Sequence, residues 1–280
     1  MKIDLKLIPT FGVAGNFTGH LEQAGEASSF THIKTAEAKA PKAIFPTYLP
    51  VAAGTVPEFL SVFPFDESRI IFPKGEEKLQ IEPECAVICN VTWNEDEVVS
   101  VSPVAFGASN DCSIRKDGAK KISQKKNWGV CSKGLSSNLI DIDSFSEGGI
   151  LDGYRIASFL VRDGKVHAYG EDSPVRDYSY IYGKLLEWMT DKFNNQQDMD
   201  PAENIHSYLL ENGKPSQVMV SIGATRYTDF GEHNFLQDGD DAVVVVYPEK
   251  KYTHDEIAEK VEKGIMAEND ISCLRQKVIM

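Results

Sequence analysis

The chain has 280 residues, of which 42% are hydrophobic and 10% aromatic, so it can fill a buried core and is not an intrinsically disordered chain. Its formal charge of −13 at pH 7 makes nucleic acid an unfavourable partner, because phosphate backbones attract basic surfaces. The one dense basic stretch, residues 116–126, contains five lysines but no aromatic residue on which a base could stack.

Glycine and proline are frequent in the first 75 residues, which is typical of short strands joined by turns and long loops. The middle of the chain is predicted to be mostly strands, because β-branched and aromatic residues dominate several short runs. These runs are residues 85–91, 98–105, 155–161 and 165–169. The last two flank Arg162-Asp163-Gly164, which predicts a hairpin.

The pattern changes over residues 180–194, where apolar residues recur every four positions and predict an amphipathic helix. These residues are Ile181, Leu185, Met189 and Phe193. Residues 218–222 and 242–247 then return to a strand pattern. Many strands, few helices and no regular strand–helix–strand alternation predict an α+β fold.

A second helix is predicted near the C-terminus. Thr253-His-Asp-Glu256 has the form of a capping box, in which each end of the motif satisfies a backbone donor of the other. Ile257, Val261 and Ile265 would share one face of the helix that begins there.

The chain is predicted to be cytoplasmic. Residues 1–6 interleave charged and apolar side chains, unlike a secretory signal, and no apolar run approaches the ~20 residues that cross a bilayer. Five cysteines are scattered along the sequence. Cys85 and Cys89 would lie about 13 Å apart on one strand, too far for a disulfide. We therefore expect reduced thiols and no membrane segment.

Glu82-Pro83-Glu84 places two carboxylates on the same side of an extended segment, because side chains alternate along a strand. Pro83 lacks a backbone donor, which favours an edge strand or a strand start. Carboxylate oxygens suit Mg²⁺, Mn²⁺ or Ca²⁺ better than zinc. Alone, the motif is better explained as solvated surface acids, since chance predicts roughly two such pairs and a second occurs at Glu95/Glu97.

Three further features have both a structural and a functional interpretation. Asn110-Asp111 follows an apolar run at a predicted strand end, where such residues commonly cap turns. Lys133 lies in a predicted loop, where a lysine ordinarily faces solvent. His20 lies in a segment bounded by Gly15 and Gly25, a pattern that suits a mobile lid, although a lone histidine is more often structural.

The order and spacing of the motifs are more informative than any single motif. The series comprises Gly-Asn-Phe-x-x-His at 15–20, Glu-x-Glu at 82–84, Asn-Asp-Cys-Ser-Ile-Arg at 110–115, a Trp to Lys-Gly stretch at 128–134, Gly-Ala-Thr at 223–225 and Phe-Leu-x-x-Gly-Asp at 235–240. It resembles the fumarylacetoacetate hydrolase superfamily in its shorter single-domain form, over about residues 8–248. The resemblance implies a mixed β-sandwich or β-roll with few peripheral helices, and a homodimer.

The resemblance also implies a site. Glu82, Glu84 and Asp111 would hold Mg²⁺ or Mn²⁺, with Ca²⁺ as an alternative. Lys133 would stabilise an enolate formed on a small oxo-acid substrate. The other residues that it implies are His20 and Glu22 as catalytic groups, and Asn16, Arg115 and Thr225 as substrate contacts. Within one structural unit, residues 1–75 would form strands, loops and the lid, residues 76–250 the catalytic core, and residues 251–280 a C-terminal helix.

The sequence departs from the family pattern at two places. Family hydrolases commonly have a glutamate three positions after the lid histidine, but this chain has Gln23, with Glu22 and Glu26 as the nearest acids. A glutamine cannot accept a proton, which favours reactions that need no attacking water. Gly223-Ala-Thr225 replaces the family Gly-Thr-Pro, so the loop is expected to bind a different end of the substrate.

Three functions are compatible with this interpretation. The first is a metal-dependent hydrolase that cleaves a C–C bond in a 2-oxo or 1,3-dicarbonyl acid of the acylpyruvate or fumarylacetoacetate type. The second is a metal-dependent decarboxylase or keto–enol tautomerase of a β-oxo acid such as oxaloacetate. The third is a non-catalytic metal-binding assembly protein that keeps the fold without turnover.

Overall fold

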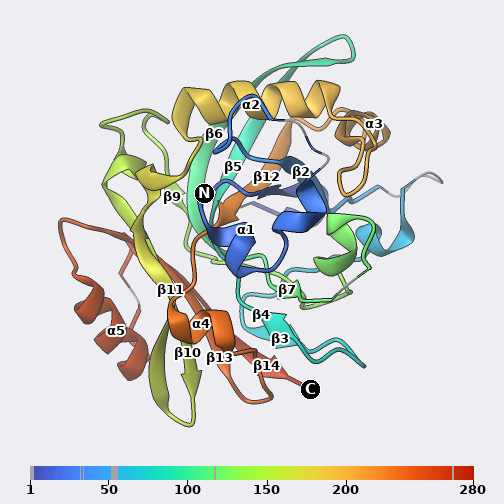
Figure 1. Cartoon of the computed structure of the whole chain (residues 1–280). Coiled ribbons are helices and arrows are strands. Elements are labelled where there is room, and N and C mark those ends of the chain that lie inside the picture. Colours follow the sequence, from blue (N-terminus) through green and yellow to red (C-terminus); the bar gives the residue numbers. More distant parts are fainter. Residues whose placement is uncertain (1–2, 32, 34, 52–55, 117, 267) are drawn as a thin grey trace.

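The computed structural model describes residues 3–31, 33, 35–51, 56–116, 118–266 and 268–280. These residues form an α+β fold in which two mixed sheets pack together and few helices lie at the periphery (Figure 1). The predicted fold class is therefore confirmed.

The larger sheet holds seven of the described strands, and all of its neighbours are antiparallel except β1 and β12. Their order is β2 (Ala43–Tyr48), β1 (Thr10–Ala14), β12 (Gln217–Ala224), β5 (Pro83–Asn94), β6 (Glu97–Asn110) and β8 (Gly134–Leu135), with β9 (Ile140–Asp141) also paired to β6. The long β5–β6 hairpin runs through the middle of this sheet.

The smaller sheet has five strands within the described residues. Their order is β11 (Lys165–Pro174), β10 (Tyr154–Arg162), β13 (Asp241–Pro248), β14 (Ser272–Ile279) and β3 (Arg69–Ile71). A separate ladder pairs β4 (Leu79–Gln80) with β7 (Ser113–Ile114). Strands from all three predicted segments share these sheets, since β1 pairs with β12 and β3 pairs with β14.

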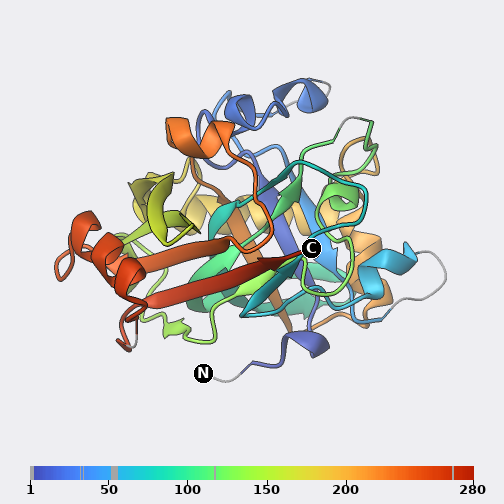
Figure 2. The same ribbon diagram turned by 90° about the horizontal axis from the view of Figure 1, so that it is seen from below.

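The helices are short apart from α2, and several are single 3₁₀ turns. The α-helices are α1 (His20–Gln23), α2 (Tyr182–Asn195), α3 (Ile205–Glu211), α4 (Asp229–His233) and α5 (His254–Lys263). The 3₁₀ turns are η1 (Leu5–Leu7), η2 (Ala27–Phe30), η3 (Glu58–Ser61), η4 (Ile122–Lys125), η5 (Ile150–Gly153) and η6 (Val175–Asp177). Figure 1 shows α2 across the larger sheet, and Figure 2 shows α5, in red, at one end of the molecule, where it contacts β10 and β11.

The main hydrophobic core joins the two sheets and the inner face of α2. Val87 and Phe106 of the larger sheet and Val244 of the smaller sheet belong to this one cluster. Helix α2 adds Leu185 and Met189 among its buried residues, which confirms the predicted apolar stripe. Burial of such side chains stabilises the fold by about 1.5–3 kcal/mol each.

The predicted strands are all present, and most extend beyond their predicted ends. The predicted hairpin joins β10 to β11, and both Asp163 (φ 52°) and Gly164 (φ 74°) adopt the positive φ that a tight hairpin turn requires. Pro83 is the first residue of β5, which confirms a strand start. The edge-strand alternative is wrong, because β5 lies between β12 and β6.

The C-terminal prediction is correct for the start of α5 and wrong for the residues beyond Lys263. The Thr253–Glu256 capping box is present. Helix α5 ends at Lys263 because Gly264 adopts a left-handed conformation (φ 67°), so Ile265 leaves the helical face and is 56% exposed. The predicted C-terminal segment also contains strand β14, which pairs with β13 and β3.

Two general expectations concern the thiols and the membrane. All five cysteines are free, as the spacing of Cys85 and Cys89 predicted. None of the helices in the described part of the chain is long and apolar enough to cross a membrane.

Candidate metal centre

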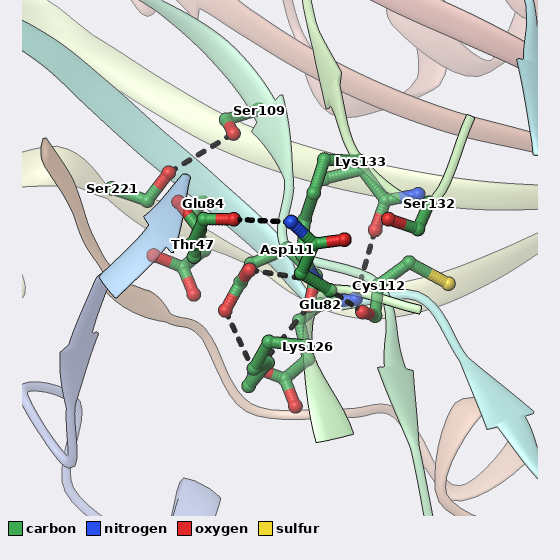
Figure 3. Close-up of polar contacts among 12 residues, drawn as sticks. Thr47, Glu82, Glu84, Ser109, Asp111, Cys112, Lys126, Ser132, Lys133 and Ser221 are labelled. Atoms are coloured by element: carbon green, nitrogen blue, oxygen red, sulfur yellow. Dashed lines mark hydrogen bonds and ion pairs between the residues drawn. The ribbon is translucent and has the colours of Figure 1, made fainter. Parts of the chain in front are cut away.

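The register of the β5–β6 hairpin brings the two acidic motifs together. Pro83 pairs with Asn110, so Glu82 and Asp111 flank the open end of the same ladder. The backbone N–H of Asp111 donates to the carbonyl of Glu82 at 3.0 Å, which extends this pairing by one residue. One oxygen each of Glu82, Glu84 and Asp111 lies within 4.8 Å of the others, and all three side chains are buried (Figure 3).

Glu84 is held by the neighbouring strand. The backbone N–H of Gly223 donates to Glu84 Oε2 at 2.8 Å, at a register irregularity in β12. Gly223 has φ +122°, and a Cβ there would lie 2.9 Å from that of Asn16, so both the backbone and the space require glycine. Burial and the nearby Asp111 carboxylate raise the pKa of Glu84 well above its usual range, which favours its protonated form.

Two buried lysines contact the carboxylates, and only one of them was predicted. Lys133 precedes β8 and lies 2.9 Å from Asp111 Oδ1, and it donates to the carbonyl of Cys112 at 2.5 Å. Lys126, at the end of η4, lies 2.5 Å from Glu82 Oε2 and 2.7 Å from Asp111 Oδ2. We call these three carboxylates and two lysines the inner cluster.

The electrostatics of the inner cluster are dominated by these contacts. Burial alone would raise the pKa of Glu82, but Lys126 and Arg115 outweigh it and hold the pKa well below its usual value. Burial would lower the pKa of Lys126, but Asp111 and Glu82 raise it overall. Burial lowers the pKa of Lys133, against the opposing effect of Asp111. The inner carboxylates therefore stabilise Lys126 as an ammonium ion.

A second group of charges surrounds the inner cluster, and we call Glu26, Arg115 and Lys125 the outer cluster. Arg115 bridges the two groups, with Nη2 2.8 Å from Glu82 Oε1 and Nη1 2.7 Å from Glu26 Oε1. Lys125 lies 2.8 Å from the same Glu26 oxygen. Arg115 also donates to the hydroxyl of Tyr227 at 2.8 Å. The predicted substrate contact Arg115 thus has several partners within the protein.

A cavity of about 360 Å³ opens beside the outer cluster. Its lining includes Glu26, Arg115 and Lys125 together with Gln23 and Gln80. The carboxylates of the inner cluster do not line it, so a molecule in this cavity reaches them only past the outer cluster.

His20 begins α1 and is buried, with its ring 5.2 Å from that of Tyr227. Burial lowers its pKa to about 4, so the ring is neutral at pH 7. Its Nδ1 has no hydrogen-bond partner among the described residues. Gln23 bonds instead to the backbone of Tyr227 and to Glu232, and therefore does not orient the histidine.

The remaining predicted residues lie in different surroundings. Glu22 is exposed and lines a surface pocket with Thr18 and Lys42, whereas Glu26 is the acid that reaches the charged clusters. Asn16 is fully buried, and its amide makes three hydrogen bonds to backbone groups, two with Tyr180 and one with Ile222. Thr225 is buried, and its N–H donates to the carbonyl of Pro83. The catalytic role of Glu22 and the substrate contacts of Asn16 and Thr225 stay predictions.

Sequence reasoning missed Lys126, Lys125 and Tyr227. The two lysines belong to the basic stretch 116–126, and nothing in the local pattern distinguishes them from the exposed Lys120. Their contacts depend on how η4, which packs against β2, places the two lysines beside acids that are distant in the sequence, and this is a tertiary feature.

The donor set fits a hard divalent cation. All three ligands are carboxylates, the oxygen donors that Mg²⁺ and Mn²⁺ prefer, and opposite ligands around Mg²⁺ are about 4.2 Å apart. The three ligand oxygens already lie within 4.8 Å of one another, so the side chains need to move only slightly to reach the spacing of metal ligands. Asp111 Oδ2 faces Lys126 as an ion pair but makes no hydrogen bond within the described residues, so its lone pairs are not fully used.

Comparison with known proteins identifies a family and a shared fold. Residues 26–278 match the model of a family of unknown function, DUF5718. No curated protein sequence matches at a significant level.

Solved structures with a similar fold include two enzymes and a protein assigned to an enzyme family. One is a protein from Yersinia pestis CO92 assigned to the fumarylacetoacetate hydrolase family, with 13% identity, TM-score 0.54, and coverage of 99% of this chain and 95% of that chain. Another is 2-keto-3-deoxy-D-arabinonate dehydratase, with 14% identity, TM-score 0.53, and coverage of 97% of this chain and 72% of that chain. The third is 5-carboxymethyl-2-hydroxymuconate delta-isomerase from Mycobacterium smegmatis, with 15% identity, TM-score 0.50, and coverage of 97% of this chain and 78% of that chain. At these identities the likeness establishes a shared fold.

Proposed function

The chain belongs to DUF5718, a family of unknown function, and from that premise we propose that it is a divalent-metal-dependent enzyme acting on a small 2-oxo or 1,3-dicarbonyl acid. One observation carries the proposal: three buried carboxylates converge beside the buried ammonium group of Lys133. Surface acids that merely solubilise a protein are not buried together, since burying a charge without a partner is costly. The similar fold of 2-keto-3-deoxy-D-arabinonate dehydratase, whose name gives a 2-keto acid as its substrate, supports this substrate class.

Glu82, Glu84 and Asp111 would hold the metal ion, which when bound supplies a Lewis acid for the 2-oxo group of the substrate. Lys133 stabilises negative charge that develops on the substrate as an enolate, because its ammonium group is buried and fixed by Asp111 and the Cys112 carbonyl. Its low exposure, 1%, strengthens this effect, since water does not screen it.

C–C hydrolysis of an acylpyruvate-like acid is the first candidate reaction, with neutral His20 as the base that takes a proton from water. A specific observation favours a second candidate, decarboxylation or keto–enol tautomerisation of a β-oxo acid. No carboxylate hydrogen-bonds to His20 Nδ1 within the described residues, and Gln23 is engaged elsewhere, so the imidazole lacks the acidic partner that would orient it as a base. His20→Ala should abolish hydrolysis and spare decarboxylation or tautomerisation.

Thermal unfolding with Mn²⁺ or Mg²⁺, with and without oxalate as an enolate mimic, tests the metal site. At a metal concentration of 100 times its dissociation constant, we expect about 2.7 kcal/mol of added stability, and a further increase with oxalate. Glu84→Gln should abolish this shift. It should leave the metal-free melting temperature almost unchanged, because a glutamine resembles the protonated carboxyl group and can still accept from Gly223.

The outcomes separate the candidate functions. Equal metal shifts in the wild type and Glu84→Gln would contradict the site. A metal shift that oxalate does not enlarge would favour the non-catalytic metal-binding protein. A shift enlarged by oxalate would support an oxo-acid enzyme, and turnover of oxaloacetate and of acylpyruvates would then decide the reaction.

A further inference from the structure

Every oxygen of two proposed metal ligands already faces a cation. Glu82 Oε1 lies 2.8 Å from Arg115, and Glu82 Oε2 lies 2.5 Å from Lys126. Asp111 Oδ1 lies 2.9 Å from Lys133, and Asp111 Oδ2 lies 2.7 Å from Lys126. Lys126 is the cation in this set that contacts both carboxylates, so its departure alone would free one oxygen on each.

Counted with Glu84 ionised, as it would be when it holds a metal ion, the formal charges of the two clusters balance before the charge of the ion is added. Four carboxylates (Glu26, Glu82, Glu84 and Asp111) face four cations (Lys125, Lys126, Lys133 and Arg115). A divalent ion added to this set would bring two uncompensated positive charges into a buried site, where such charges are poorly screened. If Lys126 leaves as the ion enters, the excess falls to one.

We propose that Lys126 is a tethered competitor of the divalent ion, whose ammonium group holds the Glu82 and Asp111 oxygens in the metal-free protein and leaves them when the ion binds. This inference rests on the proposed function, because it concerns the same carboxylates. It assigns to Lys126 the control of metal affinity: each ion must displace a cation that the chain itself supplies.

The attachment of the two lysines explains why Lys126 is the group that moves. Lys133 adjoins β8, whose Gly134 pairs with Asn110 in the larger sheet, and its Nζ also binds the Cys112 carbonyl. Lys126 follows the single turn of η4 and lies outside the sheets, so no strand ladder fixes its backbone. Each ammonium also lies near an aromatic ring, Lys126 5.2 Å from the centre of Phe45 and Lys133 5.5 Å from that of Trp128, so the difference between the two lysines is in their backbone attachment.

Mn²⁺ binding to the full-length chain, measured by isothermal titration calorimetry at one pH, tests the inference. We compare the wild type with Lys126→Met and Lys126→Gln, and use Lys125→Met as the matched control. The control removes the same charge one residue away, from a lysine that contacts Glu26 instead of the three ligands. We expect Lys126→Met and Lys126→Gln to bind Mn²⁺ at least about tenfold more tightly than the wild type, and Lys125→Met to stay within about threefold.

The two Lys126 variants differ in whether a hydrogen-bond donor remains beside the carboxylates. Methionine removes the hydrogen bonds together with the charge, whereas glutamine retains a donor for Glu82 and Asp111. Circular dichroism checks folding before each titration. If a variant unfolds without metal, its refolding on addition of Mn²⁺ is measured instead: recovery supports the inference, and failure to recover in both variants overturns it.

The remaining outcomes separate this inference from the proposed function. If the wild type binds Mn²⁺ and the folded Lys126 variants bind no more tightly, the competitor role is wrong and the metal site stands. If the wild type does not bind but a Lys126 variant does, Lys126 excludes the ion, which supports the inference. If none of the proteins binds Mn²⁺, both the competitor role and the metal requirement of the proposed function are overturned.

Discussion

The inner and outer clusters contain the same kinds of charged groups but are held by different kinds of structure. The inner carboxylates lie at the open end of the β5–β6 hairpin, where the strand ladder fixes their backbone. The outer cluster comes from three connecting segments, because Glu26 precedes η2, Arg115 follows β7 and Lys125 ends η4. Its geometry therefore depends on the ion pairs themselves.

Exposure also differs between the clusters. The side chains of Asp111 and Lys133 are 2% and 1% exposed, whereas those of Glu26 and Lys125 are 11% and 10% exposed. Water screens the outer ion pairs more strongly, so each should contribute less to stability. The comparison indicates that the inner cluster fixes the site and that the outer cluster controls the approach to it from the adjacent cavity.

Asp111→Asn should have the largest effect on the metal-free protein. Asp111 pairs with both Lys126 and Lys133, and breaking a buried ion pair leaves charge without a partner, so we expect a loss of about 3–5 kcal/mol in the free energy of unfolding. Urea unfolding followed by circular dichroism measures it. Asp96→Asn, which removes an exposed carboxylate paired with Lys214, is the control and should change stability by less than about 1 kcal/mol.

Equal effects of these two substitutions would contradict the importance assigned to the inner cluster. A large loss in Glu84→Gln would contradict it in another way. It would mean that Glu84 is already ionised in the metal-free protein, against the direction in which burial and Asp111 shift its pKa.

Glu26→Gln should have a smaller effect and sharpens the comparison from the outer side. The substitution leaves Arg115 and Lys125 without their shared carboxylate, and we expect a loss of about 2–3 kcal/mol in the free energy of unfolding. Glu22→Gln is the matched control, because Glu22 is exposed and should change stability by less than about 0.5 kcal/mol. A loss in Glu26→Gln as large as that in Asp111→Asn would remove the distinction between the clusters.

The family resemblance implied the three inner carboxylates as a set, and a simple local rule for strands explains why they meet. Alternation places Glu82 and Glu84 on the same side, and Asp111 follows the next apolar run, so pairing of the two runs brings all three together. The strand pattern also predicted β5, β6 and β12 of the larger sheet. It did not predict β14, whose alternating residues come after a helix and pair with β3 from the distant N-terminal region.

The outer cluster could not be predicted in the same way. The choice between Glu22 and Glu26 depends on how a short helix and a glycine turn orient four residues, and the sequence pattern does not determine that orientation. Lys126 illustrates the same limit, since it is adjacent to Lys125 in the sequence and only tertiary contacts distinguish the two: Lys125 pairs with Glu26, whereas Lys126 pairs with ligands of the inner cluster. Loop-borne charges are set by tertiary contacts, which local periodicity does not encode.

His20 provides the smallest of the expected effects. It tests whether the segment between Gly15 and Gly25 keeps the imidazole buried in solution. Burial lowers the pKa of its imidazole from 6.5 to about 4, against the opposing effect of the Glu82 carboxylate. Between these two values the unfolded chain binds a proton that the folded protein does not. The contribution of His20 to stability is therefore complete above pH 6.5 and is lost as the pH falls toward 4.

Relative to His20→Gln, the wild type should lose about 1–2 kcal/mol of unfolding free energy between pH 7 and pH 5. Urea unfolding of both proteins at each pH measures this difference and cancels the titration of the other groups that they share. His233→Gln removes an exposed histidine whose pKa is raised by the backbone of Asp229, so relative to this variant the wild type should show no such loss. If His20→Gln and the wild type change in parallel, the imidazole is accessible to water in the folded state, and the segment between Gly15 and Gly25 stands open over the clusters in solution.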